Sequence, residues 1–115
     1  MDYEKGLKII MDEDDLVTHV VGSSKDRGNW KAFWLKHAGR KWPDVCQIYN
    51  CGNPAQVGAH VYIKHNKSNK WCFILPTCQS CNKDSTAEWG AVDSWVSVKL
   101  GAAVVCTPLN ECCFE

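Results

Sequence analysis

Two pairs of closely spaced cysteines constrain this sequence more than any other feature. Four residues separate Cys46 from Cys51, two separate Cys78 from Cys81, and 26 residues lie between the pairs. Turns of this length present two sulfur atoms at about 2.3 Å from one ion without strain, and two such turns complete a tetrahedral thiolate cage. We therefore predict that these four cysteines bind a structural zinc ion.

Disulfide bonds and a buried cluster of free thiols are the alternatives. Disulfides require an oxidising compartment, and the charged start of the sequence has no apolar segment behind it, so no secretion signal is visible. No apolar run approaches the roughly 18 residues that a membrane span needs. Buried free cysteines rarely form two close pairs around a hairpin. We expect a cytoplasmic or nuclear protein with no membrane partner.

The length and composition are those of one globular domain over residues 1–115. Apolar residues make up 45% of the 115 and charged residues 23%, which is close to the average for folded proteins. A chain of this size has a modest core. A bound zinc ion would add folding free energy, of order 10 kcal/mol in zinc peptides near neutral pH.

The segment between the cysteine pairs predicts a β-hairpin. Residues 57–63 and 71–75 are apolar and rich in strand-forming side chains, and the polar residues 64–70 between them favour a turn. After the second pair, Asp84 or Ser85 is a suitable N-cap residue for a helix, with Glu88 completing a capping box with Ser85. Residues 46–92 are therefore expected to form a zinc-knuckle ββα unit.

An aromatic stripe predicts a helix before the first pair, within residues 25–45. Trp30, Phe33, Trp34 and His37 recur at the spacing of one helical face, and Gly39 suits the helix end. The stripe either packs into the core or offers a surface for stacking bases and binding phosphate. We expect packing, because aromatic residues at helical spacing are usually buried.

Both ends of the chain predict short strands. Residues 1–24 carry an acidic run and a β-branched stretch, which indicate an N-terminal arm or an edge strand. Residues 93–115 contain an alternating segment that predicts closing strands, followed by a Cys-rich tail; the alternative is a helix that continues through Trp95. For Cys106, Cys112 and Cys113 we favour a labile disulfide or an unstructured reactive tail over a second zinc site, and we expect Cys72 to be a small core residue.

Charge is segregated along a chain whose net charge is zero. Residues 25–83 carry ten Lys or Arg against two Asp, a net charge of +8, whereas residues 1–24 and 84–115 each have a net charge of −4. A basic middle segment attracts phosphate locally, since the field depends on where charges lie. The expected nucleic-acid contacts are Lys64, Lys67, Lys70 and Lys83, joined by Lys36, Arg40 and Lys41.

The motif order then resembles the zinc-knuckle branch of the HNH/treble-clef endonuclease-like superfamily. The similarity covers residues 46 to about 90: Cys-x4-Cys, Gly-Ala-His-Val, and Ile-Leu-Pro-Thr-Cys-x2-Cys-Asn. In that superfamily a hairpin and helix hold a catalytic divalent metal, a strand-end His activates water, and a His or Asn after the second knuckle helps to hold the metal. The resemblance implies that His60 is the base and that Asn82 is the residue after the second knuckle that helps to hold the metal.

Two positions depart from the superfamily pattern. Ala59 stands where a metal-binding Asp or His is common, and Phe73 where an Asn orients the base. Neither side chain can fix a catalytic ion. We therefore expect an incomplete nuclease site, with His60 as a core histidine or a partner of a zinc ligand; Asn66 or Asn69 could replace the missing Asn only by a different loop geometry.

The expected fold class is α+β: a small single domain in which a four-cysteine zinc site supports a ββα (treble-clef/HNH-like) unit. The expected function is a non-catalytic zinc-finger module that binds DNA or RNA. One alternative is a metal-dependent HNH-type endonuclease that uses Mg or Mn with His60 and Asn82. A second alternative is a structural or protein-interaction zinc module.

Overall fold

Two apolar strands, β3 (Val57–Ile63) and β4 (Trp71–Thr77), form the centre of an antiparallel sheet. They pair in register from Val57 opposite Thr77 to Val61 opposite Phe73. The computed structural model describes residues 3–20, 30–64, 70–83 and 95–111, and all structural statements concern these residues. The hairpin strands expected from the sequence are confirmed.

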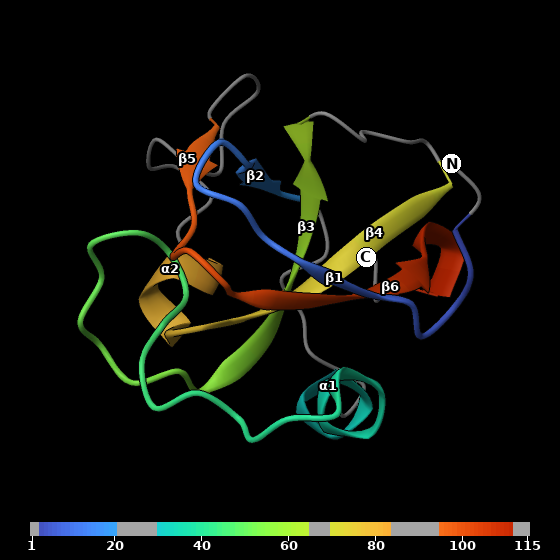
Figure 1. The fold of residues 1–115 in the computed structure, drawn as a ribbon, viewed down its shortest axis with the longest axis horizontal. Coiled ribbons are helices and arrows are strands. Elements are labelled where there is room, and N and C mark those ends of the chain that lie inside the picture. Colours follow the sequence, from blue (N-terminus) through green and yellow to red (C-terminus); the bar gives the residue numbers. More distant parts are fainter. Residues whose placement is uncertain (1–2, 21–29, 65–69, 84–94, 112–115) are drawn as a thin grey trace.

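Four more strands extend the sheet on both sides of this hairpin. The order across the sheet is β1-β6-β4-β3-β2-β5, and every pairing is antiparallel (Figure 1). The remaining elements are β1 (Lys8–Ile10), β2 (Leu16–His19), α1 (Trp30–Ala38), α2 (Gln79–Lys83), β5 (Val96–Ser97), β6 (Ala103–Pro108) and the 3-10 helix η2 (Leu109–Glu111). The closing strands expected within residues 93–115 are thus present as β5 and β6. Of the arm or edge strand expected in residues 1–24, β1 lies at one edge of the sheet, whereas β2 lies inside it between β3 and β5.

The sheet curls, so that its two outer parts approach each other. β1 and β2 lie toward opposite ends of the strand order, yet only residues 11–15 connect them. The Met11 amide continues the β1–β6 pairing by donating to the carbonyl of Ala102 at 2.7 Å, so the segment between β5 and β6 lies beside the end of β1. The main core fills the inner face of this curl and includes Met11, Val61, Phe73, Leu75 and Val104.

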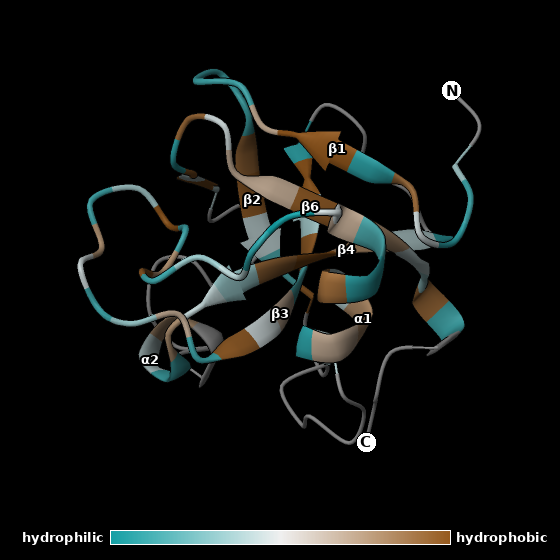
Figure 2. Ribbon diagram, turned by 60° about the horizontal axis from the view of Figure 1, so that its bottom comes forward, coloured by the Kyte–Doolittle hydropathy of each residue, from teal (hydrophilic) through white to brown (hydrophobic). Residues whose placement is uncertain are grey.

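Helix α1 covers the opposite face of the sheet. Trp34 is 1% exposed, and its indole nitrogen donates to the carbonyl of Ala103 at 3.0 Å. The helix approaches β3 closely at Gly58, where a Cβ atom would lie 2.8 Å from Ile74 and 3.1 Å from the Cβ of Trp30. The aromatic stripe therefore packs into the core, as expected. Figure 2 shows apolar residues gathered on the central strands and polar residues on the connecting turns.

The expected fold class was wrong. The hairpin does not form a separate ββα unit, because β2 and β6 flank it in one six-stranded sheet. The physical reason is the composition of β4, which is apolar at successive positions and buried from Cys72 to Thr77. Such a strand needs cover on both faces and neighbours on both edges, which one helix cannot supply. The protein is mainly an antiparallel sheet with short helices.

Some sequence expectations fall outside the described residues. These are the helix start at residues 84–89, the loop positions Asn66, Lys67 and Asn69, and the tail cysteines Cys112 and Cys113. In the part of the chain that the structure describes, no helix has the length and apolar character needed to cross a membrane.

Candidate metal centre

The first cysteine pair lies in a loop that is tied to the end of the β3–β4 hairpin. The Cys46 amide donates to the carbonyl of Asn53 at 2.8 Å, and the Gln47 amide donates to the carbonyl of Pro76 in β4 at 3.0 Å. The loop reverses at Asn50, which has a φ of 64°. Asparagine tolerates this left-handed conformation, so the reversal brings Cys51 back toward Cys46.

The second pair lies where β4 passes into α2. Cys78 directly precedes α2, and its Sγ accepts a hydrogen bond from the Cys81 amide at 3.4 Å. The side-chain amide of Asn53, which belongs to the first loop, lies 3.8 Å from the same sulfur. A sulfur with two such donors is well suited to carry negative charge. Asn53 was not among the residues singled out from the sequence.

The four sulfur atoms meet in one cluster. The Sγ atoms of Cys46, Cys51, Cys78 and Cys81 all lie within 4.8 Å of one another, and those of Cys51 and Cys78 are 3.9 Å apart. All four cysteines are free thiols rather than disulfides. Sulfur atoms at the corners of a tetrahedron with metal–sulfur bonds of about 2.3 Å would be roughly 3.8 Å apart. The four thiols therefore fit a single metal ion.

Burial raises the pKa of a thiol, and hydrogen bonds donated to its sulfur lower it. Burial raises the pKa of Cys46 to about 11, with the neighbouring thiols Cys78 and Cys51 adding to the effect, and burial also raises the pKa of Cys81. Burial acts on Cys78 too, but hydrogen bonds from Cys81, Asn53 and Cys51 outweigh it and lower its pKa to about 7. Metal binding would require all four as thiolates, so loading releases protons.

Lys99 holds the first loop from the other side. Its ammonium donates to the carbonyl oxygens of Ile48 at 3.0 Å and Cys51 at 2.6 Å, and also to that of Cys46. The Lys99 amide donates to the carbonyl of Gln47 at 2.9 Å. Lys99 is 48 residues from Cys51 in the sequence, so only the sheet topology brings the two together. Nothing in the local sequence distinguished it from a surface lysine.

His60, the base implied by the nuclease resemblance, lies in the core. It is 2% exposed, and its ring meets that of Trp30 edge-on at 4.7 Å between centroids. Its Nε2 has no hydrogen-bond partner among the described residues. The other implied position, Asn82, belongs to α2. A histidine enclosed in this way cannot reach a substrate in solvent.

The lysines expected to bind nucleic acid occupy two separate places. Lys36 lies in the last turn of α1, and Arg40 and Lys41 follow that helix. Lys64 and Lys70 lie at the turn end of the β3–β4 hairpin, just after β3 and just before β4, and Figure 1 shows these strand ends away from α1. All five are exposed. Lys83 ends α2, and Lys67 lies outside the described residues.

Two further cysteines are core residues. Cys72 in β4 is 0% exposed, as expected. Cys106 is also 0% exposed, at the centre of β6, so the expectation of a labile disulfide or an unstructured tail was wrong for this residue. Its neighbours explain the difference, because residues 103–107 are buried in succession and form an interior strand beside β4.

No protein-family model, curated protein or solved structure matches this chain.

Proposed function

We propose that this protein is a zinc-stabilised module that binds nucleic acid through the basic surface of α1. The thiol cluster supports the zinc assignment, because four sulfur donors in tetrahedral reach of one ion suit zinc better than hard cations. The ion would join the loop at residues 46–51 to the start of α2. It would act as a structural support rather than as a catalyst, since four protein ligands leave no open position.

The surface of α1 is the single observation that carries the nucleic-acid part of the proposal. Residues 30–43 contain four lysine or arginine side chains and no acidic one. Lys31, Lys36, Arg40 and Lys41 are all exposed, and the Lys31 ammonium lies 5.0 Å from the centre of the Trp42 ring. Lys5 approaches the same helix, with its ammonium 5.9 Å from the centre of the Phe33 ring.

This arrangement suits phosphate better than it suits bases. The aromatic rings of α1 that would stack on bases are turned toward the sheet, with Trp30 and Trp34 buried. Exposed lysine and arginine side chains remain, and these neutralise phosphates without reading sequence. We therefore assign to α1 a salt-dependent interaction with the nucleic-acid backbone.

Fluorescence anisotropy with labelled single- and double-stranded DNA and RNA at about 50 mM salt tests this proposal. The double variant Lys36→Glu, Lys41→Glu should weaken binding and reduce the slope of log K against log salt by about 0.9 for each duplex phosphate that the protein no longer neutralises. The comparison variant is Lys64→Glu with Lys70→Glu, which changes the same charge at the turn of the hairpin, where the sequence also predicts contacts, and should weaken binding less than the α1 variant.

Zinc content measured on the same samples separates the two parts of the proposal. Intact zinc content with no binding to any of the four nucleic acids would contradict the nucleic-acid part alone. Equal weakening of binding in the two double variants would show a general effect of net charge and would contradict the assignment to α1.

A further inference from the structure

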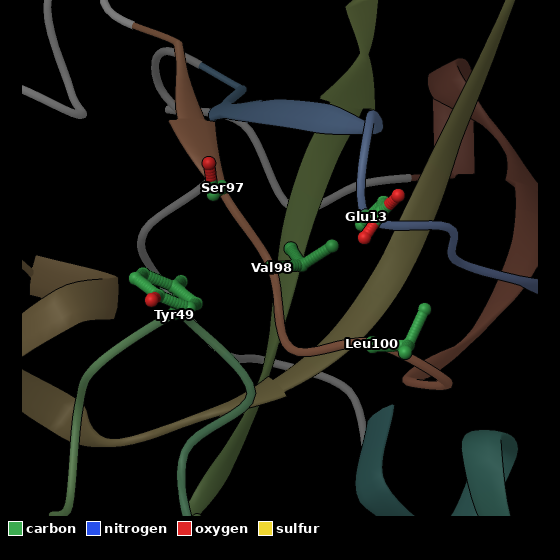
Figure 3. Close-up of a pocket in the computed structure, with 5 residues that line it drawn as sticks. All are labelled: Glu13, Tyr49, Ser97, Val98 and Leu100. Carbon is green, nitrogen blue, oxygen red and sulfur yellow. The ribbon is translucent and has the colours of Figure 1, made fainter.

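The loop that carries the first cysteine pair also forms one wall of a surface hollow. The hollow has a volume of about 360 Å³ and is lined by Glu13, Tyr49, Ser97, Val98 and Leu100 (Figure 3). These residues come from three separate segments: the turn between β1 and β2, the loop at residues 46–51, and the chain in and after β5. A volume of this size takes one or two side chains of a partner.

The walls of the hollow are held by backbone hydrogen bonds. The Tyr49 amide donates to the carbonyl of Ser97 at 2.9 Å, and the Asp15 amide closes the acidic turn on the carbonyl of Asp12 at 3.1 Å. Leu100 occupies a tight turn in which the Ala102 amide donates to the carbonyl of Lys99 at 3.1 Å. Gly101 follows with a φ of 82°, a conformation that favours glycine. A partner would meet a largely preformed surface.

The rim of the hollow exposes two large apolar side chains. Leu100 is 73% exposed and Tyr49 is 67% exposed, the two highest values among the exposed large hydrophobic residues of the described chain. Figure 3 shows Leu100 and Val98 directed toward the region below Glu13. Apolar side chains gathered around a hollow are typical of a site that contacts another molecule.

One wall of the hollow, the turn between β1 and β2, is acidic. Glu13 lines it, and the neighbouring Asp12 and Asp14 are exposed on the same turn. Among the described residues no basic side chain lines the hollow. Two cations lie nearby and are engaged with backbone carbonyls: Lys99 donates to the 46–51 loop, and Arg40 donates to Gly101 at 3.1 Å. An acidic turn beside an apolar wall is complementary to a cationic segment that also carries an apolar side chain.

We propose that this hollow binds a basic peptide segment of a partner protein. A leucine, phenylalanine or similar side chain of the segment enters between Tyr49 and Leu100, and flanking lysine or arginine residues face Glu13 and its neighbouring aspartates. This site carries the opposite charge to the α1 surface, although the two adjoin where the Arg40 guanidinium donates to the carbonyl of Gly101 at 3.1 Å. Its occupant is a cation, so the proposal does not depend on nucleic-acid binding. The protein would then join an anionic partner at α1 to a cationic partner at the hollow.

Titration of the metal-loaded protein with short synthetic peptides tests the proposal, with binding followed by NMR at the backbone amides of Tyr49, Ser97 and Leu100. A peptide that alternates lysine with leucine or phenylalanine should shift these amides. Oligolysine of equal charge should bind more weakly, and a peptide with glutamate in place of lysine should leave them unchanged.

Single substitutions locate the site. Leu100→Ser should weaken binding of the basic apolar peptide by roughly tenfold, because it removes an apolar side chain that the complex buries. Glu13→Lys should weaken it as well. The matched controls, Leu35→Ser on α1 and Glu4→Lys near the N-terminus, replace exposed residues elsewhere and should have no effect.

Three results would overturn the proposal. The first is equal affinity for the glutamate peptide, and the second is unchanged binding of the basic apolar peptide by Leu100→Ser and Glu13→Lys. The third is a shift of these amides with protein concentration alone, which would show that a second copy of the chain occupies the hollow. Failure of nucleic-acid binding at α1 would leave these measurements unaffected.

Discussion

The ammonium of Lys99 lies 2.6 Å from the backbone carbonyl oxygen of Cys51. The same ammonium also reaches the carbonyls of Ile48 and Cys46, so one side chain from the turn after β5 holds three carbonyls of the first cysteine loop. Carbonyl oxygens only accept hydrogen bonds, so these three need donors from outside the loop. The lysine ammonium has three N–H donors and supplies one to each. The lysine therefore fixes the loop that presents Cys46 and Cys51.

Replacing Lys99 by methionine should destabilise the protein. The substitution nearly keeps the length of the side chain but leaves partly buried carbonyl oxygens without their charged donor, and we expect the free energy of unfolding to fall by about 2–3 kcal/mol. Urea denaturation of the metal-loaded protein measures the change. Lys64→Met removes an exposed lysine at the hairpin end and serves as the control. Equal stabilities for the two variants would contradict the role assigned to Lys99.

Gly58→Ala should also destabilise the protein, through the contact between α1 and β3. The added Cβ would lie 2.8 Å from Cγ2 of Ile74 and 3.1 Å from the Cβ of Trp30, so helix or strand must move. Overpacking of this kind costs about 1–3 kcal/mol. Gly52→Ala is the matched control, because its Cβ would meet no atom within 4 Å. Unfolding followed by tryptophan fluorescence should separate the two variants, and a stable Gly58→Ala protein would disprove this close approach.

The stability of the protein should fall in alkaline solution partly because of Cys106. Burial raises the pKa of this thiol from 9.0 to about 12. Between these values the unfolded chain loses the proton of this thiol while the folded chain keeps it. The contribution of Cys106 to the free energy of unfolding is therefore complete below pH 9 and is lost as the pH rises toward 12. The slope from one such group is at most about 1.4 kcal/mol per pH unit.

Comparison with Cys106→Ala isolates this effect. Both proteins should be studied with metal bound, and the variant should show a shallower decline in the free energy of unfolding above the ordinary pKa of the thiol, 9.0. Parallel declines in the two proteins would contradict the burial of this thiol.

We expect no metal-dependent DNA cleavage by this protein. His60 is 2% exposed and lies against Trp30, so it has no access to a phosphate in solvent. Incubation of plasmid DNA with the zinc-loaded protein and magnesium or manganese checks this expectation. Cleavage that disappears in a folded His60→Ala variant would show instead that the histidine acts as a base.

The sequence predicted those elements whose pattern is local. The aromatic spacing from Trp30 to His37 predicted α1, and the apolar runs at residues 57–63 and 71–75 predicted β3 and β4. The spacing of the cysteines predicted which four thiols would lie together. Each of these patterns lies within a short stretch or repeats a known ligand spacing.

The sheet order could not be predicted, because it depends on pairings between distant segments. β1 has only three residues, and its partner β6 begins 93 residues after Ile10. The β-branched stretch at residues 16–21 does not by itself reveal whether it has one neighbour or two. For the same reason, Lys99 and Leu100 could not be connected with the cysteine loop, because only the sheet brings the turn after β5 beside that loop.

The central claim is that one zinc ion joins Cys46, Cys51, Cys78 and Cys81, and X-ray absorption spectroscopy at the zinc edge tests it most directly. Combined with elemental analysis, it should show one zinc ion per chain with four sulfur neighbours at about 2.3 Å. Cys78→Ser should lose this signal or replace one sulfur by oxygen, whereas Cys72→Ser should retain it. Iron in place of zinc, a shell of nitrogen and oxygen ligands, or a metal-free folded protein with all four thiols reactive would contradict the account.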